Sequence, residues 1–351
     1  MLHAFVPTVG VGVVAALVTL GTTPVVGRLA RVLGMHDAPD DRKLHQSLVP
    51  YLGGMAILAG WIVAFLTPGT FAQSAVLLGS MTVLGIVGFV DDRYDISPHL
   101  RLGVQVAIAC LAYAGGIRMT PTEITALDFL LTVLWLVGMT NAFNFMDNMD
   151  GLATGVGGIA ALFLGLSGII FGQQLVSVLG FGLAGACLGF LRHNFHPARI
   201  FMGDTGSLPL GFGLAALAIK VKFPGVHPLI AFAVPVVILG LFLIDTTVMA
   251  LGRAARREPL IGGRLDHLSH RLLKKELPVR RVAVRMYGAA VALGCSALLM
   301  ATLSLVFGLV SLGVVLIVSF WAGGVALRWP ILRGLESTTR PESPQLAAAR
   351  P

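Results

Sequence analysis

Long apolar segments recur along the whole chain, and they restrict its fold more than any other feature of the sequence. A helix needs about 20 mostly apolar residues to cross a bilayer. Only 12% of the 351 residues are charged, whereas soluble domains carry about 25%. We therefore expect an all-α, polytopic membrane bundle. Residues 1–330 would form one transmembrane domain, and residues 331–351, rich in Pro, Ser and Ala, a disordered tail.

Breaks at charged residues, prolines and glycines divide the apolar sequence into eleven predicted spans. They lie near residues 4–27, 51–67, 71–90, 102–117, 124–140, 151–171, 174–191, 206–222, 228–251, 283–303 and 306–327. The breaks at Gly115–Gly116 and Phe307–Gly308 depend on glycine, which does not by itself end a transmembrane helix. The first span is too long for the apolar part of a cleavable signal peptide, so we expect it to remain in the protein.

The Lys and Arg residues fall almost entirely in one of the two sets of connecting segments that eleven spans create. Of the 25 such residues, Arg118, Lys220 and Lys222 alone lie in the other set. Because cytoplasmic loops carry the excess of Lys and Arg, we expect the N-terminus outside and the C-terminus in the cytoplasm. The basic inner face and the high Ala, Gly and Arg content favour a bacterial inner (plasma) membrane.

Acids, asparagines and histidines gather in four clusters at the ends of the predicted spans. The clusters are Asp91–Asp92, Asn141–Gly151, Gly203–Ser207 and Asp266–His270. The alternation of loops puts all four on the predicted cytoplasmic side. Such a surface suits a membrane enzyme that handles a metal-bound diphosphate, because carboxylate and amide oxygens are good Mg²⁺ ligands.

Two of the clusters also have simple structural explanations. Asp91 and Asp92 could be solvated charges at a helix end, although the helix dipole disfavours acids there and a bound cation would offset that cost. One of them could also act as a base that the other orients. Asp204 could be a helix N-cap, or the glycines around it could let backbone N–H groups reach a phosphate.

The second cluster is the most specific, because its polar residues recur every three positions. Asn141, Asn144, Asp147 and Asp150 would share one face if the segment is helical. The spacing of acids in an EF-hand loop is absent. A simple turn at Asp150 would explain that residue but not the register of all four.

The fourth cluster lies in a basic loop, residues 252–281. His267 and His270 could share a helical face, and contacts with a sugar diphosphate explain them better than a zinc site, which lacks further ligands. Attraction to anionic lipid would explain the arginines but not the histidines. Asp245 lies inside a predicted span, where we expect it to pair with Arg253, about two turns later.

In combination these motifs resemble the polyprenyl-phosphate N-acetylhexosamine-1-phosphate transferase superfamily, glycosyltransferase family 4. The resemblance covers residues from about 28 to 275, including the segment 37–54. It is closer to the bacterial undecaprenyl-phosphate GlcNAc-1-phosphate transferases than to the phospho-MurNAc-pentapeptide transferases. Asn148 and Ser269 depart from the family's pattern, which has Gly and His at these positions. The residues that follow Asp92, Arg93–Asp95, argue against the pentapeptide substrate.

The resemblance implies transfer of a sugar-1-phosphate, most simply GlcNAc-1-phosphate, from a UDP-sugar to undecaprenyl (polyprenyl) phosphate with release of UMP. This would begin a lipid-linked cell-envelope glycan. The implied cofactor is Mg²⁺, or Mn²⁺ in its place, with Asn144 and Asp204 as its ligands. The implied catalytic residues are Asp91, Asp92, Asp147, Asp150, His267 and His270, and the substrate-binding residues are Lys43, Asn141, Asn144 and Arg264. Among them, Asp91 resembles the acid that would deprotonate the lipid phosphate. The partners are then the two substrates and the lipid bilayer, with no nucleic acid; a homodimer is compatible.

Two other functions stay open at the level of the sequence. Another UDP-N-acetylhexosamine, including the MurNAc-pentapeptide donor, could be the substrate. An ion-coupled transporter would instead need acids inside spans and broken helices at mid-membrane, yet only Asp245 and Asp128 lie within predicted spans. For the transfer itself, direct attack by the lipid phosphate and a covalent aspartyl intermediate are both compatible, and we favour direct attack.

Overall fold

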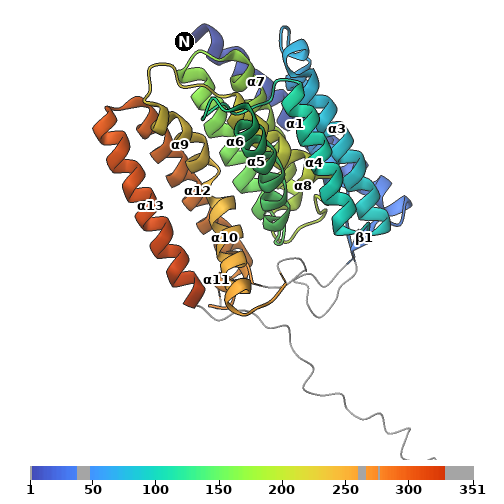
Figure 1. Ribbon diagram of the computed structural model, residues 1–351. Coiled ribbons are helices and arrows are strands. Elements are labelled where there is room, and N and C mark those ends of the chain that lie inside the picture. The colour runs from blue at the N-terminus through green and yellow to red at the C-terminus, as the bar shows by residue number, and fades with distance from the viewer. Residues whose placement is uncertain (1, 38–47, 260–265, 276, 329–351) are drawn as a thin grey trace, which may run out of the picture.

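The protein folds into a bundle of long helices, which Figure 1 shows as a computed structural model. The structure describes residues 2–37, 48–259, 266–275 and 277–328. Its helices are α1 (Leu2–Val32), α2 (Gly53–Phe65), α3 (Phe71–Tyr94), α4 (Pro98–Ala114), α5 (Thr125–Met146), α6 (Leu152–Ile170), α7 (Gln174–Asn194), α8 (Asp204–Lys220), α9 (Pro228–Ile238), α10 (Gly240–Ala255), α11 (Leu268–Leu273), α12 (Val279–Thr302) and α13 (Leu305–Arg328). Within these residues the one sheet is a short antiparallel pair, β1 (His36–Asp37) and β2 (Val49–Pro50). The predicted helical membrane bundle is confirmed, and the tail lies outside the described residues.

A helix lies at each of the eleven predicted spans, but the ninth span is broken in two. α9 and α10 meet at Leu239 with a bend of 72°. Among the described residues, seven helices are long and apolar enough to cross a membrane, or eight if this bent pair is one span. The chain is thus a multi-pass membrane protein, while the count of eleven and the sidedness stay predictions. In Figure 1, α1 begins at the end of the bundle opposite to the end where α13 stops.

One predicted helix break is attributed to the wrong residues, although the predicted spans 283–303 and 306–327 agree closely with α12 and α13. Phe307 and Gly308 lie inside the first turn of α13. The break comes instead from Leu303, whose backbone is extended with φ −96° and ψ −179°. Gly308 donates a hydrogen bond to the carbonyl of Ser304 and so continues the helix, in keeping with the tolerance of transmembrane helices for glycine. The other glycine break is confirmed, because α4 is capped by Gly115.

Helix α8 is the centre of the bundle, and glycines on its neighbours allow this. Every residue from Thr205 to Ile219 is buried, and α2, α3 and α5 pack against the helix. A Cβ atom on Gly88 of α3 would lie 2.2 Å from the carbonyl oxygen of Asp204, and one on Gly54 of α2 would lie 2.1 Å from the Cα of Gly206. The backbones of α2 and α3 therefore touch the first turn of α8, where one of the acid clusters begins.

The outermost helix, α13, carries apolar side chains on its exposed face. Ile317, Phe320 and Trp321 are 70%, 87% and 67% exposed. In water such a continuous apolar surface would have to be covered. For a helix of a membrane bundle it is the surface that faces lipid tails.

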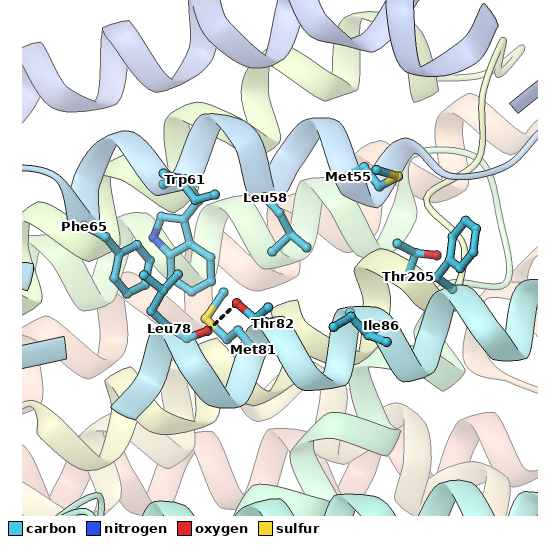
Figure 2. A pocket seen from close by; sticks show the side chains of 12 residues that line it. Met55, Leu58, Trp61, Phe65, Leu78, Met81, Thr82, Ile86 and Thr205 are labelled. Carbon is cyan, nitrogen blue, oxygen red and sulfur yellow. Dashed lines mark hydrogen bonds between the residues drawn. The ribbon is translucent and has the colours of Figure 1, made fainter. Parts of the chain in front are cut away.

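An apolar slot of about 440 Å³ separates α2 from α3. Figure 2 shows Trp61 and Phe65 at one end of the slot and Met55 and Thr205 at the other. Successive turns of the two helices line it, and almost all of its lining is apolar. The slot is open to the lipid-facing side, because Met55 and Ile62 are partly exposed there.

Candidate active site

The four predicted clusters come together at one end of the bundle, the lower end in Figure 1, where α11 lies. Hydrogen bonds link them: Asp92 to Thr205, Asn144 to Asp204, and Ser269 to Asn148. We use the name acidic centre for Asp91, Asp92, Asn144, Asp147 and Asp204. We use the name histidine segment for residues 266–271.

Asp92 caps α8 from a neighbouring helix. Its Oδ1 accepts a hydrogen bond from the backbone N–H of Asp204 (2.8 Å), and its Oδ2 accepts from the N–H (3.0 Å) and the hydroxyl (2.6 Å) of Thr205. Gly203, the residue at the N-cap position, has no side chain to do this. These contacts also offset the dipole penalty for an acid at the end of α3. The N–H groups of Asp204 and Thr205 are therefore occupied, which contradicts the alternative that they bind a phosphate.

Arg101 is a candidate that the sequence motifs did not indicate. It lies in the first turn of α4, and its guanidinium binds Asp91 Oδ2 at 2.7 Å and Asp204 Oδ2. Sequence placed it only among the basic loop residues. The Ser97–Pro98 pair does predict a helix start, but nothing local reveals partners that lie on two other helices.

The two implied metal ligands are adjacent. Asn144 Nδ2 donates to Asp204 Oδ1 at 2.7 Å and to Ser207 Oγ at 2.8 Å. Asn141 lies one turn earlier and donates instead to Gln105 Oε1 at 2.6 Å. Asn141 therefore braces α5 against α4, one layer behind the acidic centre.

Asp147 is the least compensated acid of the centre. It follows the last residue of α5, and no hydrogen-bond donor reaches its carboxylate from the described residues. Burial, and then the charges of Asp204, Asp92 and Asp150, raise its pKa to about 7. A carboxyl group with such a pKa can exchange a proton near neutral pH.

Asp150 does not continue the polar stripe, which corrects the prediction that all four polar residues share a helical face. The helix ends at Met146, so the three-residue register is lost after Asp147. Asp150 Oδ2 lies 2.7 Å from His196 Nδ1 and accepts from the N–H of Ala198 at 3.0 Å. These contacts tie the α5–α6 connection to the α7–α8 connection.

The predicted pair of Asp245 and Arg253 is wrong. Arg253 binds Asp266 with two hydrogen bonds of 2.8 and 2.9 Å, and Asp245 binds His267 Nδ1 at 2.8 Å. Both residues of the pair lie on α10, but each finds its partner in the histidine segment. The spacing of two helical turns places both residues on one helix. It does not show whether their side chains turn toward each other or toward another segment.

The two histidines of the segment differ in their surroundings. His267 precedes α11 and has Asp245 as a partner. His270 is buried, and burial followed by the charge of His267 lowers its pKa to about 4. His270 is therefore neutral at physiological pH.

The histidine segment is docked on the second cluster by the two residues that depart from the family's pattern. Ser269 Oγ donates to Asn148 Oδ1 at 2.8 Å. The ring of His267 also lies near Phe145, with 6.3 Å between ring centroids. The fourth cluster thus contacts the second cluster. Lys43 and Arg264, the remaining predicted binding residues, lie outside the described residues.

The apolar slot reaches this site only at Thr205, whose hydroxyl donates to Asp92. The carboxylate of Asp204 points to α4 and α5, through Arg101 and Asn144, whereas the slot lies between α2 and α3. The close approach of Gly88 to Asp204 leaves no room between the α3 and α8 backbones at that level.

The fold and the site together define a class: a multi-pass membrane protein with an acid-rich centre at one end of its bundle. Comparison with known proteins gives the family. The model of glycosyl transferase family 4 matches residues 74–222, a range that includes the whole acidic centre.

Three relatives match most of the chain. A Bacillus subtilis protein described as "probable undecaprenyl-phosphate N-acetylglucosaminyl 1-phosphate transferase" is 33% identical over 287 residues, 78% of this chain and 80% of the relative. A decaprenyl-phosphate N-acetylglucosaminephosphotransferase of Mycobacterium tuberculosis is 31% identical over 368 residues (92% and 89%). A phospho-N-acetylmuramoyl-pentapeptide-transferase of Moorella thermoacetica is 30% identical over 322 residues (83% and 98%). The chain belongs to glycosyl transferase family 4.

Proposed function

We propose that the protein transfers N-acetylglucosamine-1-phosphate from UDP-GlcNAc to a polyprenyl phosphate and releases UMP. The reaction would begin a lipid-linked glycan of the cell envelope, at the cytoplasmic face of a bacterial inner membrane. Relatives named for undecaprenyl or decaprenyl phosphate and N-acetylglucosamine support the substrates. The basic loops on the side of the clusters support the sidedness.

The observation that carries this proposal is the arrangement around Asp204. Its carboxylate accepts hydrogen bonds from the amide of Asn144 and the guanidinium of Arg101. Other acids, including Asp147, lie around it. Phosphoryl transfer depends mainly on positioning and on neutralising phosphate charge. A transporter would have no use for this group of acids at one end of the bundle.

The residues of the acidic centre fit a divalent cation. Asp204 offers carboxylate oxygens, and Asn144 Oδ1, which accepts no hydrogen bond from the described residues, offers an amide oxygen. Within the described part of the chain, no three His, Cys, Asp or Glu side chains form a complete metal site. Two protein ligands would be enough for Mg²⁺, which keeps several waters and shares substrate phosphates, and Mn²⁺ could replace it. When bound, the ion would neutralise charge on the diphosphate.

The lipid phosphate would attack the phosphorus that carries the sugar, forming a new P–O bond while the P–O bond to UMP breaks. Asp147 is suited to accept a proton from a protonated lipid phosphate, because no described donor occupies its carboxylate and its pKa is about 7. Asp91, the acid implied for this role, has one oxygen bound by Arg101 and the other by the N–H of Ile96. Its role as proton acceptor stays a prediction.

Direct attack requires no covalent carrier on the protein. Arg101 can hold a negatively charged oxygen beside Asp91 and Asp204, because its guanidinium has five N–H donors. His267 and His270 would contact the nucleotide-sugar donor. Trapping a sugar-phosphate adduct on an aspartate would contradict direct attack.

The first test measures UMP released by purified protein from UDP-GlcNAc and undecaprenyl phosphate, with Mg²⁺ and with EDTA. We expect UMP only when the lipid and the metal are both present. Replacing the donor with UDP-GalNAc or UDP-MurNAc-pentapeptide then identifies the sugar, and turnover of the pentapeptide donor alone would favour that relative's activity. Folded protein that releases no UMP from any of the three donors would overturn the proposal.

A further inference from the structure

Asp245 is a buried acid that the proposed reaction does not use. It lies on α10 with 1% of its surface exposed. Its Oδ2 lies 2.8 Å from His267 Nδ1, and its Oδ1 accepts a hydrogen bond from the N–H of Leu268 at 2.7 Å. A buried carboxylate is costly unless such partners satisfy it. Both of its partners belong to the histidine segment.

These contacts determine which nitrogen of His267 carries a proton. The oxygens of an ionised carboxylate only accept hydrogen bonds, so Nδ1 of His267 must be the donor. Nε2 lies on the far side of the ring, and no partner among the described residues binds it. The ring also lies near Phe145, between the implied site residues Asn144 and Asp147. Asp245 therefore holds an imidazole whose second nitrogen has no partner among the described residues, and whose ring lies near a residue of the second cluster.

Two further contacts fix the same segment from other directions. Arg253 binds Asp266 through two hydrogen bonds, and Ser269 donates to Asn148. The histidine segment is thus held at consecutive positions by α10 and by the second cluster. A group that is fixed before the substrate arrives loses less conformational entropy on binding.

We propose that Asp245 is a positioning residue, which orients His267 so that Nε2 accepts a hydrogen bond from a hydroxyl group of the nucleotide-sugar donor. The proposal deepens the proposed function and rests on it for the identity of the donor. Asparagine at position 245 has nearly the same shape but offers one oxygen and one NH₂ group. One of the two donors, His267 Nδ1 or the N–H of Leu268, would then face another donor. The imidazole would have to move its proton to Nε2 or turn away.

The kinetic experiment compares wild type, Asp245→Asn, His267→Ala and the double variant. In the His267-containing protein, Asp245→Asn should raise the KM for UDP-GlcNAc about tenfold, as loss of an orienting partner commonly does. The KM for undecaprenyl phosphate should change less than twofold. In the His267→Ala protein, Asp245→Asn should change neither value, because the residue that it orients is gone.

Asp128→Asn is the matched control, since Asp128 is also a buried acid on a long helix and binds Thr122 instead. It should leave both KM values unchanged. Losses that multiply in the double variant, or a rise in both KM values, would overturn the proposal and make Asp245 a purely structural residue.

A spectroscopic measurement separates this inference from the proposed function. The ¹⁵N NMR signals of His267, assigned by their loss in His267→Ala, report which ring nitrogen is protonated without any substrate. In the neutral ring we expect the proton on Nδ1 in wild type, and a changed tautomer in Asp245→Asn. The same signals in both proteins would overturn the positioning role, whereas absence of UMP release by wild type would count against the proposed function alone.

Discussion

The acidic centre and the histidine segment lie at the same end of the bundle, yet their charges are balanced in opposite ways. In the acidic centre, Arg101 is the one described cation that binds its carboxylates, and Asp147 has no described donor. In the histidine segment, Asp266 receives two hydrogen bonds from Arg253. Although burial opposes ionisation of Asp266, the hydrogen bonds and charge of Arg253 lower its pKa.

This difference in charge compensation distinguishes residues suited to bind a ligand from residues that stabilise the fold. Burial and neighbouring acids raise the pKa of Asp147 to about 7. Ionising this carboxyl group is therefore unfavourable, and no described residue offsets the free energy that it costs. Such perturbed groups are typical of functional sites. The paired charges around Asp266 are typical of an anchor, since breaking a buried ion pair is far more costly than never having it.

The largest effect should follow from replacing Asp204, which joins the partners of the acidic centre. Asp204→Asn removes the charge that Arg101 and Asn144 share, and we expect kcat to fall at least about a thousandfold, as when a group that stabilises transition-state charge is lost. UMP release measures the loss. Thermal unfolding of the variant is the control and should show a folded protein. An Asp204→Asn variant with full activity would contradict its assignment as a metal ligand.

Replacing Arg253 tests whether its ion pair with Asp266 stabilises the fold at the histidine segment. Arg253→Met leaves Asp266 buried with fewer partners, and we expect a loss of about 3–5 kcal/mol in the free energy of unfolding. Thermal or denaturant unfolding in detergent measures it. Adding Asp266→Leu should recover much of the loss, because the second change removes a buried charge that, among the described residues, Arg256 alone would otherwise pair. A loss below about 1 kcal/mol, the value of an exposed pair, would show that this pair is not an anchor.

Replacing Arg101, which binds two acids of the acidic centre, should reduce activity more than it reduces stability. Arg101→Met removes the cation between Asp91 and Asp204, and we expect kcat/KM to fall about a hundredfold, within the usual effect of one charge-stabilising group. Arg101→Lys should recover part of it. Arg93→Met is a matched control, because Arg93 is exposed near the same acids. Equal losses in the Arg101 and Arg93 variants would reduce Arg101 to one of many basic residues.

The class of fold could be predicted from the sequence because its signal is local. Each apolar run is long enough to indicate a helix without knowledge of its neighbours. The break at Gly115 was found in the same way, whereas the one at Leu303 was attributed to Phe307–Gly308, since an extended leucine leaves no mark in the sequence. The bend at Leu239 was missed as well, although its leucine has a different backbone conformation, with φ −88° and ψ 5°.

The residues of the site could be predicted from the sequence more easily than the hydrogen bonds and ion pairs between them. Asn144 and Asp204 were paired through a family resemblance, and the structure brings them to 2.7 Å. Arg101 and Asp204 are 103 positions apart, and Asp92 and Thr205 are 113 apart. Such pairs depend on how helices pack, which a single sequence does not encode locally. The Asp245 partner was predicted wrongly because reach along a helix was taken for contact.

The pH dependence of stability should distinguish the uncompensated acid from the paired ones. The pKa of Asp147 is about 7 in the folded protein and near 3.8 when the chain is unfolded. Between these values the unfolded state loses a proton that the folded state keeps, so stability falls as the pH rises through this range. Asp147→Asn should therefore raise the melting temperature at pH 8 and have little effect near pH 4. Metal-free thermal unfolding measures this, and a gain that is constant with pH would contradict the raised pKa.

The smallest predicted effect concerns the hydrogen bond that joins the two compared regions. Ser269 and Asn148 both depart from the family's pattern, and they contact each other at 2.8 Å. If the hydrogen bond between Ser269 and Asn148 takes the place of the contact that other family members make there, the effect of each residue depends on the presence of the other. Ser269→Ala and Asn148→Gly should each reduce kcat/KM for the donor, and the double variant should lose less than the product of the two. A double-mutant cycle should give a coupling of about 1 kcal/mol, the usual value of one such hydrogen bond. Full additivity would mean that the histidine segment is held by α10 alone, through Asp245 and Arg253.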